Sequence, residues 1–226
     1  MTGILPVALS RACRLNDYFI HRDKEYVGIM RLHEEVSEEK LREVIKSFTG
    51  KIIQMPPVRS RVKRAPRERE VKSFEILEIS GKDVLFRTIV QAGTYIRKLC
   101  DDMGKEIGGA HMLELRRTKA GIFNEDNLVN LYDFEKAIEE YKKGNEELLR
   151  KILIPAEIVS QVLPVIQFKK ENLKQLLTGK PLMKSDIKEK LPKDGFFALF
   201  NDDNFIGIYH LVQEGDIIAR PDFIFN

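Results

Sequence analysis

Residues 93–99 read Gly-Thr-Tyr-Ile-Arg-Lys-Leu and place Arg97 in the first turn of a predicted helix, with Thr94 as its expected N-cap. An apolar stripe at helical spacing predicts the buried face of this helix: Ile96, Leu99, Cys100, Met103 and Ile107. A helix N-terminus carries partial positive charge, so Arg97 is expected to have an anionic partner. Spacing alone favours a surface carboxylate such as Asp101, four residues on. A carboxylate or phosphate held in a cleft is the alternative.

The neighbouring segments predict a mixture of helices and strands. Residues 37–48 have the pattern of an amphipathic helix, and residues 128–153 are largely helical with one break. Residues 74–79 and 84–90 alternate as the two strands of a hairpin. Because the pattern contains no regular βαβ repeat, the predicted fold class is α+β.

The C-terminal part of the chain predicts a second, smaller domain. Residues 154–164 carry two prolines and mark a boundary, so we expect domains over residues 1–158 and 159–226. Beyond the boundary, a helix over residues 170–177 precedes short apolar strands separated by turn residues. Several short strands with turn signals indicate a small β-barrel.

Composition indicates an ordinary globular protein. The chain has 226 residues, of which 43% are hydrophobic and 32% charged, and its formal net charge is +3. No apolar run approaches membrane-spanning length, and no membrane association is expected. Two cysteines, Cys13 and Cys100, do not make a disulfide framework, which favours a reducing cytoplasm. No cysteine or histidine spacing suggests a metal site.

Basic residues are concentrated in one stretch. Between Arg59 and Arg69 there are six basic residues and one acid, Glu68. Since such a cluster repels itself, we expect an exposed loop after Pro56 and Pro57 that either is simply solvated or contacts phosphates. Arg116, Arg117 and Lys119 form a second basic patch.

Several motifs together resemble a known family. Residues 110–118 read Ala-His-Met-Leu-Glu-Leu-Arg-Arg-Thr, and residues 54–60 read Gln-Met-Pro-Pro-Val-Arg-Ser ahead of Lys63. Residues 24–33 read Lys-Glu-Tyr-Val-Gly-Ile-Met-Arg-Leu-His. With residues 93–99, and in this order, they resemble the TruB/dyskerin family of RNA pseudouridine synthases, especially the archaeal member of H/ACA ribonucleoprotein particles. Residues 176–181 are similar to a PUA domain, a small RNA-binding barrel.

The resemblance implies specific roles in the site. Arg97 matches the arginine that holds the catalytic carboxylate ionised and oriented. Tyr26 matches the active-site tyrosine, whose ring stacks on the base and whose hydroxyl can relay a proton. Leu115 matches a pocket leucine that packs on the base. The target uridine must be flipped out of the RNA to reach these groups, and no metal or organic cofactor is required.

The resemblance also implies partners. These are RNA, either a tRNA or an H/ACA guide RNA with its rRNA target, and the small proteins of that particle. The residues expected to contact RNA are Arg59, Arg61, Lys63, Arg64, Arg116 and Arg117.

One part of the family pattern is missing. The family's catalytic aspartate lies in a Gly-Thr-Leu-Asp-Pro stretch just ahead of a run that matches Thr2 to Val7. We therefore expect the nucleophile, and the N-terminal part of the catalytic domain, to lie before Met1. The alternative is a non-catalytic RNA-binding scaffold derived from the synthase. The intact Tyr26, Arg97 and Leu115 favour the enzyme.

Overall fold

The computed structural model describes residues 2–58, 62–168, 173–187, 191–192 and 195–225 and groups the chain into two compact units. Unit 1 comprises Met1–Val7 and Ile20–Leu128, and unit 2 comprises Ala8–Phe19 and Val129–Asn226. The expected boundary at residues 158 and 159 therefore falls inside unit 2. The physical reason is a shared core, in which Leu15 and Val159 pack with Ala198 of the C-terminal sheet.

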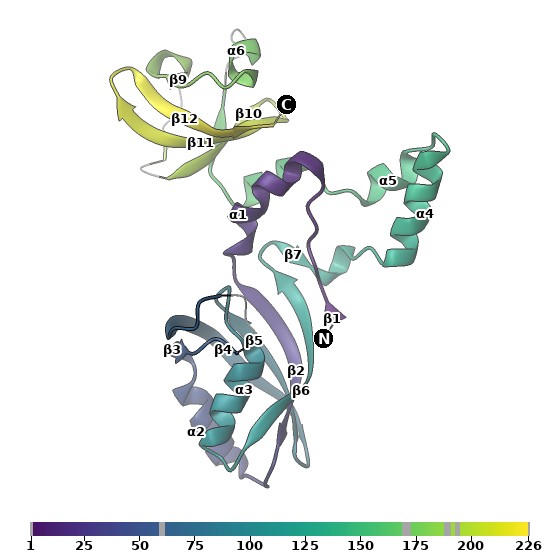
Figure 1. Ribbon diagram of the computed structural model, residues 1–226, viewed down its shortest axis with the longest axis vertical. Helices are drawn as coiled ribbons and strands as arrows, with labels where there is room; N and C mark the ends of the chain where they lie inside the picture. Colours follow the sequence, from purple (N-terminus) through teal and green to yellow (C-terminus); the bar gives the residue numbers. More distant parts are fainter. Residues whose placement is uncertain (1, 59–61, 169–172, 188–190, 193–194, 226) are drawn as a thin grey trace. The chain divides into compact units, whose positions relative to one another are not determined.

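Unit 1 is built on one mixed sheet with two helices (Figure 1). Among the described residues, seven strands form this sheet in the order β1-β6-β2-β5-β4-β3, with β7 paired to β6. Their bounds are β1 Thr2–Gly3, β2 Lys24–Leu32, β3 Gly50–Gln54, β4 Arg67–Ser80, β5 Asp83–Val90, β6 Ala110–Ala120 and β7 Phe123–Asn124. Helices α2 (Glu38–Ser47) and α3 (Ile96–Lys105) cover one face, and a 3₁₀ turn spans Glu125–Asn127. The predicted α+β class is confirmed.

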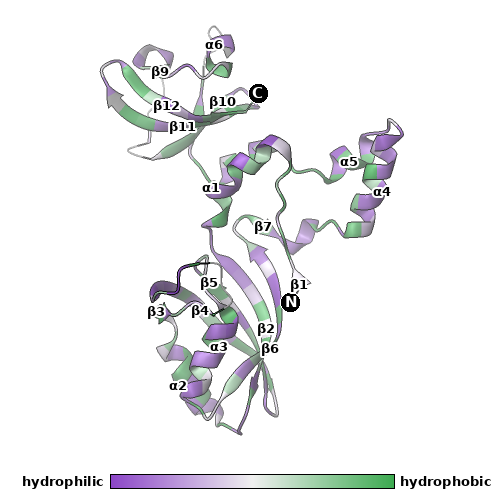
Figure 2. Ribbon diagram, viewed as in Figure 1, coloured by the Kyte–Doolittle hydropathy of each residue, from purple (hydrophilic) through white to green (hydrophobic). Residues whose placement is uncertain are grey.

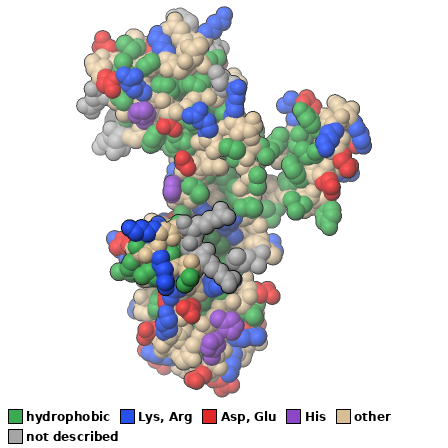
Figure 3. Space-filling view, in the orientation of Figure 1, with side chains coloured by type: hydrophobic (Ala, Val, Ile, Leu, Met, Phe, Trp, Pro, Cys, Tyr) green, Lys and Arg blue, Asp and Glu red, His purple; other side chains and the backbone are tan. Residues whose placement is uncertain are grey.

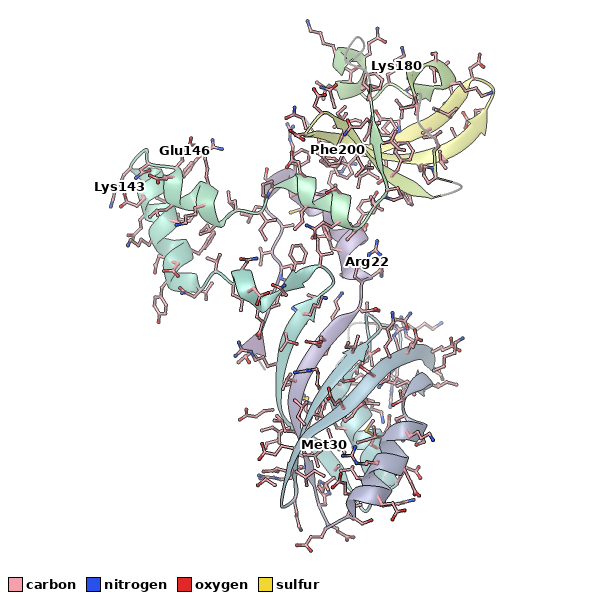
Figure 4. All side chains as sticks on the ribbon, turned by 180° about the vertical axis from the view of Figure 1, so that it is seen from behind. Arg22, Met30, Lys143, Glu146, Lys180 and Phe200 are labelled. Carbon is pink, nitrogen blue, oxygen red and sulfur yellow. The ribbon has the colours of Figure 1, made fainter. Side chains whose placement is uncertain are left out.

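The core of unit 1 lies between this sheet and its helices. The apolar stripe of α3 is buried as predicted, with Leu99 and Met103 fully inaccessible. It packs in one cluster with Leu41 of α2, Phe86 of β5 and Met30 of β2, the last labelled in Figure 4. Burying side chains of this size stabilises a fold by roughly 1.5–3 kcal/mol each, so this face sets the position of both helices.

Strand β4 is longer than the sequence predicted, and part of the basic stretch belongs to it. The predicted strand began at residue 74, whereas β4 begins at Arg67 because it pairs with β3 over the whole of Gly50–Gln54. Arg67 and Arg69 are consequently half-buried on the helix-covered face rather than in an exposed loop. Glu68 lies on the opposite face, where Lys51 pairs with it at 3.0 Å.

Unit 2 contains a curled sheet, labelled at Phe200 in Figure 4. Its strands within the described ranges run in the order β8-β10-β11-β12-β9. Their bounds are β8 Val165–Gln167, β9 Leu182–Met183, β10 Phe196–Asn201, β11 Asn204–Glu214 and β12 Ile217–Ile224. Figure 2 shows hydrophobic residues recurring along β11 and β12. Tyr209, fully buried, stacks on Phe197 with ring centroids 6.0 Å apart. Closure of this sheet into a barrel remains a prediction.

The helices of unit 2 are short. They are α1 Asn16–Ile20, α4 Leu131–Lys142, α5 Glu147–Ile152 and α6 Leu173–Leu177, with 3₁₀ turns over Ser10–Leu15, Ala156–Gln161 and Lys184–Asp186. The predicted break in the helical segment 128–153 is confirmed between α4 and α5. Hydrophobic side chains gather on the surface of this helix pair in Figure 3, and Leu131 and Tyr132 are more than four-fifths exposed. Within the described ranges, no helix combines the length and apolarity needed to cross a membrane.

Candidate active site

Two of the predicted site residues lie on neighbouring strands of the unit 1 sheet. Tyr26 of β2 is opposite Arg117 of β6, and Gly28, two residues further along β2, is opposite Leu115. Because alternate residues of a strand share a face, Tyr26 and Leu115 both face helices α2 and α3. Leu115 is 8% exposed within the main core, and Tyr26 is half-buried against the same core. The sheet therefore brings this tyrosine and this leucine together.

Gly28 lies under closely packed side chains on this face of the sheet. A Cβ atom at Gly28 would lie 2.8 Å from the ring of Phe86 and 2.9 Å from Cδ1 of Leu115. Both distances are shorter than a van der Waals contact allows. The glycine therefore allows Phe86 and Leu115 to pack directly over β2. The sequence motifs assigned no role to it, although a glycine inside a strand is the usual signal of a close approach.

Arg97 is the second residue of α3. The flanking Ile96 and Leu99 are 4% and 0% exposed, so the helix is held firmly against the sheet. Arg97 itself is exposed, and it makes no hydrogen bond or ion pair with any residue that the structure describes. Asp101, the expected surface partner, instead contacts Lys98 at 3.3 Å and Lys105 at 3.7 Å. Among the described residues, none competes with an external anion for the guanidinium of Arg97.

The predicted N-cap of this helix was wrong by one residue. Tyr95 is the N-cap of α3, with an extended backbone and no capping bond from its side chain. The hydroxyl of Thr94 instead donates to the carbonyl oxygen of Gln91 at 2.7 Å, inside the turn that precedes the helix. That turn contains Gly93, whose φ of +82° suits glycine.

A buried side chain from another strand holds this N-cap residue. Gln54, at the end of β3, is 2% exposed. Its Oε1 accepts a hydrogen bond from the backbone N–H of Tyr95 at 3.0 Å, and its Nε2 donates to the carbonyl oxygen of the same residue at 3.2 Å. Gln54 belongs to one of the motifs quoted above, but the resemblance gave it no role. A polar residue at an inward position of a strand was the available signal.

Two cationic side chains near Tyr26 donate hydrogen bonds to backbone carbonyl oxygens of the protein. Arg117 donates from Nε to the carbonyl oxygen of Ile4 at 2.7 Å, and its Nη2 donates to the same oxygen. Lys24 donates from Nζ to the carbonyl oxygen of Ile20 at 2.7 Å. Burial lowers the pKa of Lys24, and the charge of Arg117 lowers it further. Positive charge at this end of the sheet favours the ionised form of a nearby carboxylate.

The residues expected to contact RNA have different surroundings. Lys63 and Arg64 are exposed in the segment between β3 and β4, as predicted. Arg59 and Arg61 lie outside the described residues. Arg116 is paired with Glu125 at 2.6 Å, so only its remaining donors are available to a phosphate.

Comparison with family models gives two adjacent matches. Residues 33–96 match the model of the N-terminal domain of TruB family pseudouridylate synthases. Residues 97–160 match the model of the C-terminal domain of tRNA pseudouridylate synthase B. The two matches meet between Ile96 and Arg97, within the first turn of α3.

Several archaeal proteins are similar in sequence to this chain. A probable tRNA pseudouridine synthase B of Archaeoglobus fulgidus is 40% identical over 226 residues, which cover 97% of this chain and 70% of the relative. The corresponding protein of Methanopyrus kandleri is 49% identical over 171 residues, covering 75% of this chain and 51% of the relative. The protein of Methanothermobacter thermautotrophicus is 43% identical, and the match covers 58% of it. The chain thus spans little more than half the length of the last two relatives.

Solved structures match over almost the whole chain. One is the crystal structure of a Cbf5-Nop10-Gar1 complex, with a TM-score of 0.86 and 37% identity over 99% of this chain and 73% of that one. Another is an H/ACA ribonucleoprotein bound to a substrate RNA containing 2′-deoxyuridine, with a TM-score of 0.84 and 35% identity. That match covers 99% of this chain and 72% of the solved chain.

Proposed function

Because the chain belongs to the TruB family of pseudouridylate synthases, we propose that this protein forms pseudouridine in structured RNA. The observation that carries the proposal is the placement of Tyr26 and Leu115 on one face of the sheet, under a helix whose first turn carries Arg97, which pairs with none of the described residues. This arrangement offers a base-binding surface and a cation for a carboxylate in one unit of the protein.

The reaction breaks the bond between ribose C1′ and uracil N1 and forms a bond between C1′ and C5. The C5 hydrogen leaves to solvent as a proton, and N1 gains a proton, so no oxidant or reductant is consumed. Because the edge of a base in a folded RNA is covered, the uridine must first be flipped into a pocket. The protein's task is to bind the flipped base and to stabilise the charges that develop on it.

Each site residue has a role that fits its surroundings. Tyr26 stacks on the base, and its half-buried ring loses little conformational freedom when it does so. Leu115 packs against the base from the neighbouring strand. Arg97 orients the catalytic carboxylate through its planar fork and keeps it ionised.

We propose that the substrate is a tRNA T-loop, an rRNA site selected by an H/ACA guide RNA, or both. The names of the archaeal relatives support tRNA, and the similar structures of H/ACA complexes support guide RNA and small partner proteins. Residues 159–226 act as a PUA-like RNA-binding domain in this proposal, and Lys63 and Arg64 contact phosphates. We place the reaction in the cytoplasm, consistent with the free thiols of Cys13 and Cys100.

We further propose that the catalytic aspartate is supplied by residues that precede the 226 of this chain. The chain contains no Gly-Thr-Leu-Asp-Pro stretch, and Thr2 to Val7 match the run that follows it in the family. The same observation is the basis of the second candidate function, a non-catalytic RNA-binding scaffold. An extended form, with an upstream segment that includes this stretch, separates the two.

The proposal is tested by release of tritium from RNA labelled at uracil C5. We expect the extended form to release tritium and Arg97→Lys to reduce the rate on the order of 100-fold or more, because lysine keeps the charge but lacks the fork. Arg42→Lys is the matched control, since Arg42 lies on α2 and, among the described residues, its ion pair is with Glu38 one helical turn away. Near-native turnover by Arg97→Lys would refute the role assigned to Arg97.

A further inference from the structure

Gln54 is a buried polar residue whose side-chain amide, among the described residues, bonds to the backbone of Tyr95. It is the last residue of β3, on the face that the helices cover, and only 2% of it is exposed. Buried amides in folded proteins are almost always hydrogen-bonded, because water can no longer satisfy them. Gln54 meets this requirement entirely through the backbone of Tyr95.

The geometry of this pairing is specific to an amide side chain. Oε1 of Gln54 accepts from the N–H of Tyr95 at 3.0 Å, while Nε2 donates to the carbonyl oxygen at 3.2 Å. A carboxylate lacks the donor, and a hydrocarbon or thioether side chain lacks both groups. The carbonyl oxygen of Tyr95 also accepts the first intrahelical hydrogen bond, from the N–H of Leu99 at 2.9 Å. Gln54 therefore contacts the point where the helical hydrogen-bond ladder begins.

The N-cap residue of helix α3 does not cap the helix with its own side chain. The first turn of a helix has unpaired N–H groups and frays unless a side chain or a tertiary contact holds it. The side chain of Tyr95 makes no capping bond, and the hydroxyl of Thr94 donates its hydrogen bond to the carbonyl oxygen of Gln91. Arg97 lies two residues after Tyr95, in this same turn. Whatever fixes Tyr95 also fixes the starting point of the Arg97 side chain.

We propose that Gln54 is a positioning residue for Arg97: its amide holds the N-cap of α3 against the end of β3, so that the guanidinium extends from a fixed first turn of the helix. The inference rests on the proposed function for the role of Arg97. Gln54 also ends the strand that leads into the segment carrying Lys63 and Arg64, which we expect to contact RNA. The hydrogen bonds of Gln54 thus connect the start of that segment to the helix that carries Arg97.

The first experiment tests whether Gln54 holds the start of α3, and it requires no catalytic turnover. Amide hydrogen exchange of the 226-residue chain is followed by mass spectrometry for Gln54→Met, which keeps the length of the side chain but removes both polar groups. We expect faster exchange confined to the start of α3, with β2 and β6 as protected as before. Gln91→Leu is the control, because Gln91 is exposed and its side chain lies in the same turn. Unchanged protection of α3 in Gln54→Met would overturn the proposal.

The second experiment measures turnover in the extended form. We expect Gln54→Met to lower kcat on the order of 100-fold with KM unchanged, because a misplacement of about 1 Å is enough for such a loss. In an Arg97→Lys background the same substitution should have little further effect, since the two residues act as a unit. Equal losses in both backgrounds would show a general structural defect and overturn the proposal.

A second variant keeps the test decisive if Gln54→Met does not fold. Gln54→Asn keeps the amide on a side chain one methylene shorter, so its two polar groups reach the backbone of Tyr95 less well and we expect a smaller loss of protection and of kcat than in Gln54→Met. A Gln54→Asn variant with native exchange and native kcat would contradict the proposal. If the extended wild type forms no pseudouridine, the proposed function fails, and the exchange experiment still decides whether Gln54 holds α3.

Discussion

Gly104 of helix α3 lies against the first residue of strand β6, and replacing it with alanine tests the packing that carries the site. A Cβ atom at Gly104 would lie 2.2 Å from the backbone N of Ala110 and 2.9 Å from its Cα. Real Cβ atoms do not approach backbone so closely, so α3 must move away from β6. Because the obstacle is main chain, no side-chain rotation can relieve it.

Two opposing effects set the magnitude of this change. Alanine is preferred over glycine in a helix interior by about 1 kcal/mol, which alone would stabilise α3. Overpacking of a filled core costs roughly 1–3 kcal/mol, and a clash with backbone belongs at or above the upper end of that range. We therefore expect a net destabilisation of about 2 kcal/mol, which corresponds to roughly 30-fold faster exchange of amides that open with unit 1.

The assay is native-state hydrogen exchange of the buried amides of β2 and β6, which reports on unit 1 separately from unit 2. Lys46→Ala, at an exposed position of α2, is the control and should change exchange little. Adding Ala110→Gly to Gly104→Ala should not restore stability, because the backbone N of residue 110 remains in place. Neutral or slower exchange in Gly104→Ala would refute the packing argument and leave helix propensity as the dominant effect.

Three further predictions concern binding, thiol chemistry and pH. Lys63→Ala with Arg64→Ala should weaken RNA binding and lower the slope of log affinity against log salt by about 1 for each phosphate that the variant no longer neutralises; an unchanged slope in a filter-binding titration would show that the segment is only solvated. Burial raises the pKa of the Cys100 thiol to about 12, so iodoacetamide at pH 8 should modify the exposed Cys13 and leave Cys100 intact until the protein unfolds, as read by intact-mass spectrometry. Burial raises the pKa of Asp102, but hydrogen bonds from Lys105 and Lys98 outweigh it and hold the pKa below its ordinary value. The stability from this carboxylate should therefore be present above about pH 4 and disappear as the pH falls further; a stability difference between wild type and Asp102→Asn that persists unchanged at pH 2 would contradict this.

The elements with strong periodicity were predictable from the sequence. The apolar stripe of α3, the hairpin of β4 and β5 and the break between α4 and α5 follow from local spacing of apolar and turn residues. The α+β class follows from their order along the chain. These features depend on interactions within a short stretch, which is where sequence patterns carry most information.

Features that depend on distant residues were not predictable. The start of β4 at Arg67 is set by pairing with β3, and the N-cap at Tyr95 is set by Gln54, which lies 41 residues earlier. The inclusion of residues 8–19 in unit 2 depends on Leu15 packing with the C-terminal sheet. No local pattern marks such pairings, because each partner alone is compatible with several environments.

The candidate site divides in the same way. The motifs identified Tyr26, Arg97 and Leu115, and the structure adds that Tyr26 and Leu115 share a face over Gly28 and that Arg97 has no acidic partner among the described residues. The roles of these residues in catalysis remain predictions.

The most direct test of the account compares the 226-residue chain with the extended form, each incubated with tRNA and with guide RNA plus its target, and maps pseudouridine by mass spectrometry. The account predicts that both forms bind RNA and that only the extended form, which we propose supplies the aspartate, converts uridine to pseudouridine. Conversion by the 226-residue chain at a comparable rate would contradict it and require a different nucleophile, and no conversion by the extended form would show that the protein is an RNA-binding scaffold.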